Sequence, residues 1–182
     1  MSTFTFETTP RVICEVDGAL RLGALCRELG AERVLLVSDP GLQRAGLLDA
    51  PMQALREAGV EVTLYSDVQA DPPQDSVLDA VAAGHNCRAQ AVIGLGGGSS
   101  LDTAKLVALL CGHEQKLEDI YGIGLAKGPR LPLIQVPTTA GTGSEVTNVA
   151  ILSDKVAQLK KGIVSDYLLP DVALVSPQMT LT

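Results

Sequence analysis

Three consecutive glycines stand where the chain changes from an apolar segment to an amphipathic one. Residues 91–95 are mostly apolar, residues 96–98 are glycine, and a helical pattern runs from Ser99 to Leu110. Glycine allows positive φ and a close approach to a ligand, and the free N–H groups of a helix's first turn bind anions such as phosphate. Ser99 and Asp102 also fit the S-x-x-D pattern of a helix start. The stretch predicts an anion-binding turn between a strand and a helix.

This turn differs from the two common phosphate-binding motifs. Gly94 and Gly96 match the start of the dinucleotide fingerprint, but Ser99 occupies its third glycine position. No Gly-Lys-Ser/Thr sequence follows, so the turn is not a P-loop. Taken alone, the motif leaves open a tight turn that binds nothing.

A second polar loop follows another apolar run, residues 131–136. It reads Pro-Thr-Thr-Ala-Gly-Thr-Gly-Ser-Glu over residues 137–145, with four hydroxyls, two glycines and one acid. Hydroxyls can donate to phosphate or ribose oxygens. They can also cap their own backbone, so this loop alone does not decide between a ligand site and a capped turn.

A carboxylate follows a third apolar run, residues 33–38. Asp39 precedes Pro40, and Asp at an N-cap with Pro at the first helical position is a strong helix start. In parallel sheets, ligands bind at the carboxyl ends of the strands. We therefore expect Asp39 and the glycine turn to line one crevice.

The elements that must position these residues alternate between strands and helices. Such alternation predicts an α/β fold with a doubly wound, mostly parallel sheet and helices on both faces, which is Rossmann-like. A short β-hairpin near the C-terminus is also expected, with strands at 146–152 and 157–161 around Ser153 and Asp154. The expected strands are 33–38, 60–65, 89–94, 131–136 and 172–175, with edge strands within 4–14, and the expected helices are 19–29, 51–58, 76–83 (ending at Gly84) and 99–110.

Composition fits one α/β domain and excludes several classes of partner. Hydrophobic residues make up 46% of the 182 residues and aromatic residues 3%, so the core is aliphatic. The net charge of −7 and the lack of a basic patch argue against nucleic acid and anionic membranes. No apolar run approaches the ~20 residues of a membrane span, and the first residues lack a signal-peptide pattern. The four cysteines form no C-x-x-C pair, and we interpret them as buried apolar residues of a cytoplasmic protein.

The three motifs occur together in a recognisable order. The chain contains Ser38-Asp39-Pro40-Gly41-Leu42, then Gly96-Gly97-Gly98-Ser99-x-x-Asp102-x-Ala104-Lys105, then Pro137-Thr138-Thr139-Ala140-Gly141-Thr142-Gly143-Ser144-Glu145, followed by Lys160 and Leu169-Pro170-Asp171. This set resembles the iron-containing (group III) alcohol dehydrogenases over essentially the whole chain.

The resemblance implies that residues 1–182 are the NAD-binding half of a metal-dependent alcohol dehydrogenase. Asp39 would face the adenosine ribose, the glycine turn would hold the pyrophosphate, the threonines would line the nucleotide, Asp102 would lie near the nicotinamide and Lys160 would reach a ribose. A carboxylate accepts ribose hydroxyls and repels a 2′-phosphate, so we expect NAD rather than NADP. The cofactor-binding residues implied are Asp39, Gly96, Gly97, Gly98, Ser99, Asp102, Thr138, Thr139, Thr142 and Lys160. Asp39 and Asp102 can also act only as helix caps, and Lys160 can be a solvated charge.

In this family a helical C-terminal domain holds a divalent metal, Fe or Zn. The two histidines here, His85 and His113, are not at ligand spacing, so we assign no metal ligand and no catalytic residue. We expect this chain to bind NAD weakly and to be inactive alone. Its expected partners are a small alcohol or aldehyde, the helical domain and a second copy of the chain. A dehydroquinate synthase-like lyase half and a non-catalytic nucleotide-binding module remain alternatives.

Overall fold

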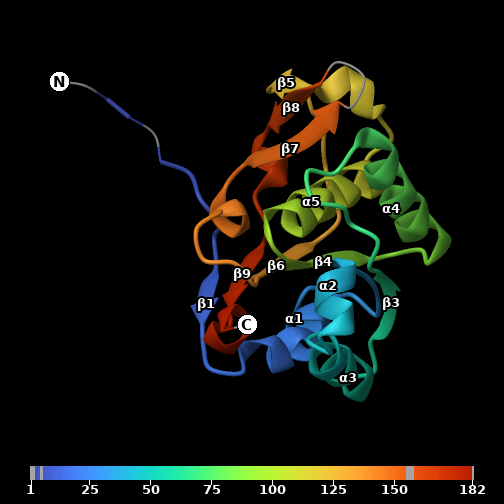
Figure 1. Cartoon of the computed structure of the whole chain (residues 1–182), viewed down its shortest axis with the longest axis vertical. Coiled ribbons are helices and arrows are strands. Elements are labelled where there is room, and N and C mark those ends of the chain that lie inside the picture. The colour runs from blue at the N-terminus through green and yellow to red at the C-terminus, as the bar shows by residue number, and fades with distance from the viewer. Residues whose placement is uncertain (1–2, 5, 155–157, 182) are drawn as a thin grey trace.

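A six-stranded parallel sheet forms the centre of the molecule (Figure 1). The computed structural model describes residues 3–4, 6–154 and 158–181. Across the sheet the strands are β1 (Val12–Cys14), β9 (Val172–Val175), β6 (Leu133–Pro137), β4 (Ala91–Gly96), β2 (Arg33–Val37) and β3 (Glu61–Tyr65).

Helices cover both faces of this sheet, as the alternation of strands and helices predicts (Figure 1). Along β2, Leu35 and Val37 pack on one face, whereas Val34 and Leu36 pack on the other. The first face carries α4 (Gln74–Asn86) and α5 (Gly98–Gly112), and the second carries α1 (Leu22–Glu28) and α3 (Asp49–Glu57). The short α2 (Pro40–Arg44) and five 3₁₀ turns, Gly18–Arg21, Leu117–Ile120, Ser144–Val146, Asp166–Leu168 and Pro177–Thr180, complete the described elements.

A smaller mixed sheet lies beside α5, above the main sheet in Figure 1. It contains β5 (Gly122–Ile123), β8 (Leu159–Val164) and β7 (Val149–Asp154), of which β7 and β8 are antiparallel. The expected hairpin is therefore confirmed, but its register differs from the prediction. Ser153 and Asp154 pair with Lys160 and Leu159 inside the strands, and Ala157, expected to begin the second strand, lies outside the described residues.

Three local expectations are wrong. The N-terminal segment is a strand only at Val12–Cys14, after Pro10, which has no N–H for strand pairing. The Thr8 and Thr9 hydroxyls donate to the Val146 and Glu145 carbonyls. Cys14 is exposed on the edge strand. Helix α4 continues through Gly84, where a β-carbon would lie 2.8 Å from Cys111 Sγ, so this glycine allows α4 to approach α5.

The strand order places a crevice between β2 and β4. From β2 the chain continues outward to β3, whereas from β4 it continues in the opposite direction to β6. Ligands of open α/β sheets bind outside the carboxyl ends of strands at such a reversal. Within the described residues, no helix is long and apolar enough to cross a membrane.

The C-terminal end of α5 packs directly on backbone, which gives a test of the fold. A β-carbon on Gly112 would lie 2.6 Å from backbone atoms of Arg130 and Leu131, whereas one on Gly162 would meet nothing within 4 Å. We expect Gly112→Ala to lower the free energy of unfolding by about 1–3 kcal/mol, because backbone must move to admit the methyl group. The matched Gly162→Ala should stay within about 0.5 kcal/mol of the parent. Urea unfolding of both variants measures this difference, and equal stabilities would contradict the packing described.

Candidate nucleotide-binding site

The glycine turn is built by strand β4 running directly into helix α5. Strand β4 extends to Gly96, Gly97 precedes the helix, and α5 begins at Gly98. Gly96 has φ 155°, and a β-carbon there would lie 2.6 Å from Ser100 Oγ. A side chain at this position would therefore be both strained and obstructed, which is the physical reason for the glycine.

The predicted S-x-x-D cap is wrong, because Ser99 lies inside the first turn of α5. Gly97 is the N-cap and provides no side chain to cap the helix. Ser99 Oγ instead accepts a hydrogen bond of 3.2 Å from the backbone N–H of Asp71. Asp102 instead contacts the end of the threonine loop and strand β7, where its carboxylate accepts the Ser144 hydroxyl and the Ile151 N–H.

Asp39 lies next to the glycine turn. Its Oδ1 accepts the N–H groups of Gly41 and Leu42 at 2.8 and 3.1 Å, which confirms it as the N-cap of α2. Its Oδ2 faces the other way, 3.4 Å from the place of a β-carbon on Gly96. Nearby, the buried Ser38 hydroxyl donates to the Leu95 carbonyl at 2.8 Å and joins the ends of β2 and β4.

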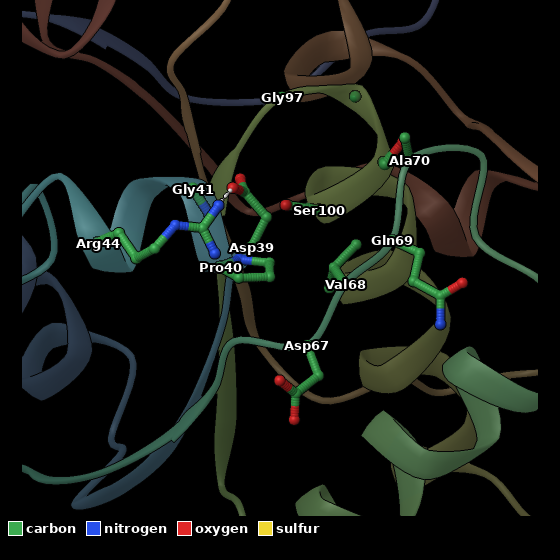
Figure 2. A pocket seen from close by; sticks show the side chains of 12 residues that line it. Asp39, Pro40, Gly41, Arg44, Asp67, Val68, Gln69, Ala70, Gly97 and Ser100 are labelled. Carbon is green, nitrogen blue, oxygen red and sulfur yellow. Dashed lines mark hydrogen bonds between the residues drawn. The ribbon is translucent and has the colours of Figure 1, made fainter.

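The Asp39 turn and the glycine turn together line a cleft of about 760 Å³ (Figure 2). Its volume lies within the about 300–1,000 Å³ typical of small-molecule sites. The segment after β3 forms its third wall. The lining residues are Asp39, Pro40, Gly41, Arg44, Asp67, Val68, Gln69, Ala70, Gly97, Gly98, Ser99 and Ser100. The expectation that Asp39 and the glycine turn share one crevice is confirmed.

The threonine loop lies against the glycine turn, outside the residues that line this cleft. The Thr138 N–H donates to the Gly96 carbonyl at 3.0 Å and continues the pairing of β6 with β4. β-Carbons on Gly97 and Gly98 would lie 3.3 Å from Thr139 Oγ1 and Thr142 Cγ2. The side chains of Thr139 and Thr142 therefore limit the size of the residues at positions 97 and 98. Both threonines are exposed, so a ligand can also reach them.

Lys160 is connected to the glycine turn through one intermediate residue. Its Nζ lies 2.7 Å from Asp71 Oδ1, and the Asp71 N–H donates to Ser99 Oγ. Lys160 and Asp71 are 61% and 64% exposed, so the ion pair itself adds little stability. The structure places Lys160 at the hairpin side of the site and not among the cleft-lining residues.

Lys105 belongs to the motif of residues 96–105 and is a buried charge for which the sequence predicted no role. Its side chain is fully buried, and Nζ donates to the Val149 carbonyl at 2.7 Å and lies 3.5 Å from Asp102 Oδ1. Burial lowers the pKa of Lys105 to about 8, against the opposing attraction of the Asp102 and Glu145 carboxylates. A single lysine within the apolar run 101–110 was the signal available in the sequence.

The buried lysine connects α5 with the hairpin and with the threonine loop. Glu145 Oε2 is buried without a hydrogen-bond partner in the described part of the chain, and its charge acts on Lys105. Thr147 Oγ1 lies 3.4 Å from Lys105 Nζ. These contacts fix the surroundings of Asp102.

The described residues offer no site for a metal ion. No group of three or more His, Cys, Asp or Glu side chains among them could hold one. His85 is exposed on α4, and His113 caps the far end of α5. Because α5 has 15 residues, His113 lies about 20 Å from the glycine turn.

Comparison with known proteins identifies the group to which this arrangement belongs. The family model for iron-containing alcohol dehydrogenase matches residues 9–177. The chain belongs to the iron-containing alcohol dehydrogenase family. It is 42% identical over 159 residues to long-chain-alcohol dehydrogenase 1 of Geobacillus thermodenitrificans, covering 86% of this chain and 40% of the relative. It is 37% identical over 177 residues to sulfoacetaldehyde reductase of Bilophila wadsworthia, covering 97% and 46%.

Solved structures of this family have the same fold. The crystal structure of a 1,3-propanediol oxidoreductase superposes with a TM-score of 0.93 at 32% identity, covering 98% of this chain and 47% of that protein. Sulfoacetaldehyde reductase from Bifidobacterium kashiwanohense, solved in complex with NAD⁺, gives 0.90 at 27% identity, covering 99% and 48%. The iron-containing alcohol dehydrogenase chain described here thus spans about half the length of these relatives.

The buried lysine predicts a specific pH dependence of stability. The pKa of Lys105 is lowered from 10.5 to about 8 on folding, so between these pH values the unfolded chain binds more protons than the folded chain. The free energy of unfolding must therefore rise with pH in this window. Relative to Lys105→Met, we expect the parent chain to gain on the order of 3 kcal/mol across the window.

Urea unfolding of both chains at several pH values measures this gain. The loss of stability that Lys105→Met itself causes does not affect the test. The test uses only how the difference in unfolding free energy between parent and variant changes with pH. Lys116→Met, which alters an exposed lysine, is the control and should give a difference independent of pH. If the stability difference between the parent and Lys105→Met were also independent of pH, this would contradict a lowered pKa of a buried Lys105.

Proposed function

We propose that the cleft at the ends of β2 and β4 binds NAD and that residues 1–182 form the dinucleotide-binding domain of a metal-dependent alcohol dehydrogenase. One observation carries the proposal. The glycine turn and the Asp39 carboxylate lie next to each other and line one cleft at the point where the strand order reverses. The NAD⁺ complex of a related reductase supports this choice of ligand.

The glycine turn suits the pyrophosphate of NAD. Gly97 and Gly98 line the cleft without side chains, so backbone and phosphate can approach closely. Helix α5 begins directly behind them, and its first N–H groups point toward a bound anion. The Ser99 hydroxyl can donate to a phosphate oxygen while it accepts the Asp71 N–H.

The carboxylate of Asp39 suits the adenosine ribose. Its Oδ1 is engaged by two backbone N–H groups, and Oδ2 can accept a ribose hydroxyl. A 2′-phosphate at the same place would meet like charge, which favours NAD over NADP.

The remaining predicted residues would act on the hairpin side of the cleft. The hydroxyls of Thr138, Thr139 and Thr142 can donate to the nucleotide. Asp102 would lie toward the nicotinamide, where Lys105 and Ser144 hold its carboxylate in place. Lys160 would reach a ribose after its exposed ion pair with Asp71 opens.

Hydride transfer would require groups outside the described residues. In this family a divalent metal, Fe or Zn, supplies Lewis-acid polarisation of the alcohol or aldehyde oxygen. The described residues do not fit such an ion, so we assign them cofactor binding only. The proposed partners are a small alcohol or aldehyde, a metal-binding helical domain and a second copy of the chain.

Calorimetric titration with NAD, NADP and ADP-ribose tests the cofactor site. We expect NAD and ADP-ribose to bind with similar affinity, because the pyrophosphate and adenosine contacts lie in this chain. NADP should bind about tenfold more weakly, equivalent to about 1.4 kcal/mol of charge repulsion at Asp39. Absence of nucleotide binding by a folded chain would contradict the proposal.

A matched pair of glycine variants locates the site. In Gly97→Val, the side chain would enter the space between Thr139 and the pyrophosphate, and NAD affinity should fall at least tenfold. Gly162→Val adds the same side chain to an exposed position on β8 with open space around it and should leave affinity unchanged. Circular dichroism confirms that each variant is folded, and equal loss in both would place the nucleotide elsewhere.

A turnover assay tests whether the 182-residue chain binds the cofactor without catalysing hydride transfer. The 182-residue chain is mixed with NAD, 1,3-propanediol and either Fe²⁺ or Zn²⁺, and NADH is followed by absorbance. We expect no NADH above the rate without protein, since the described residues offer no metal site. Metal-dependent NADH formation would show that these residues suffice for catalysis.

A further inference from the structure

One cationic side chain lines the cleft, and neither the resemblance nor the proposed function uses it. The charged lining residues are Asp39, Asp67 and Arg44. Arg44 is the last residue of α2, and Figure 2 shows its guanidinium extending toward the Asp39 side of the cleft. Arg44 is exposed and makes no ion pair within the described residues.

Asp39 and Arg44 act in opposite directions on a ribose phosphate. The carboxylate accepts ribose hydroxyls and repels a 2′-phosphate, whereas dinucleotide-binding folds that accept NADP use a nearby arginine for this group. A guanidinium presents a planar set of donors that binds phosphate oxygens in pairs. The cleft therefore contains one determinant for each cofactor.

The position of Arg44 matches the ribose end of the proposed nucleotide. The pyrophosphate would lie on Gly97 and Gly98, and Asp39 faces this turn from the end of β2. Because Arg44 lies at the other end of the five-residue α2, it is at most about 8 Å along the helix axis from Asp39. A 2′-phosphate on a ribose beside Asp39 lies within reach of the guanidinium.

We propose that Arg44 is a second determinant of cofactor choice: Asp39 selects NAD, and Arg44 provides a phosphate contact that NADP uses once the Asp39 charge is removed. The proposal rests on the proposed binding of NAD in this cleft. It predicts that the effect of changing Asp39 depends on Arg44, which a role of Asp39 alone does not predict.

A double-mutant cycle tests this dependence. The parent chain, Asp39→Asn, Arg44→Gln and the double variant are each titrated with NAD and NADP. Asparagine keeps the shape and the N-cap of α2, so the change removes charge alone. Asp39→Asn should raise NADP affinity relative to NAD about tenfold or more, and Arg44→Gln in the same chain should abolish this gain.

Two further variants separate a phosphate contact from a general loss of charge. In the Asp39→Asn background, Arg44→Lys should retain only part of the gain, because lysine keeps the charge and loses the paired donors. Arg56→Gln removes an exposed cation from the last turn of α3, outside the cleft, and should retain all of it. NAD affinity should stay within about threefold in every Arg44 variant.

The outcomes distinguish the two proposals. NAD binding by the parent, with an equal NADP gain in the presence and absence of Arg44, would overturn the role of Arg44 and leave the cofactor site intact. An equal fall of NAD and NADP affinity in Arg44→Gln would also overturn it, since such a residue would contact a part common to both cofactors. Failure of the folded parent chain to bind either nucleotide would overturn the proposed function itself.

Discussion

The site depends on the close approach of backbone at Gly96. Strand β4 ends at Gly96, and the N–H of Thr138, directly after β6, donates to the Gly96 carbonyl. Ser100 of α5 lies where a β-carbon on Gly96 would point. The chain can turn from the sheet into α5 only with a residue that accepts φ 155° and carries no side chain. The start of α5, the position of the threonine loop and the open floor of the cleft all follow from this contact.

A second set of contacts joins the hairpin to the cleft. Lys105 extends from the buried face of α5 to the Val149 carbonyl on β7, and Asp102 accepts the Ile151 N–H on the same strand. Burying a charge is costly unless it is paired and hydrogen-bonded, and here the carboxylate and the carbonyl meet that need. The small sheet is therefore held in a fixed position against α5, next to the glycine turn.

The cleft offers donors for an anion although the chain is acidic. The net charge is −7, yet the glycine turn presents backbone donors, and Arg44 adds one positive charge to a lining that also contains Asp39 and Asp67. Such a site can bind the pyrophosphate of a dinucleotide although the protein surface is not basic overall. Selectivity among dinucleotides then depends on the few charges at the proposed ribose end, where Asp39 and Arg44 both line the cleft (Figure 2).

Much of the fold was predictable because its signals are local. Buried parallel strands are continuous apolar runs, and Asp39 before Pro40 marks a helix start that the structure confirms. The expected end of α4 at Gly84 was wrong because this glycine lies inside the helix, where it makes room for Cys111 of α5, a residue far away in the sequence. The expected cap at Ser99 was wrong because α5 already begins at Gly98, with Gly97 as its N-cap.

The sequence by itself determined the alternating elements, the polar loops at the strand ends and the resemblance carried by their order. The crevice shared by Asp39 and the glycine turn was also expected, from their positions at strand ends. The tertiary structure alone decided that Lys160 lies outside the cleft lining and that Lys105 is buried. These outcomes depend on contacts between segments far apart along the chain, and local propensity and spacing carry no information about such contacts.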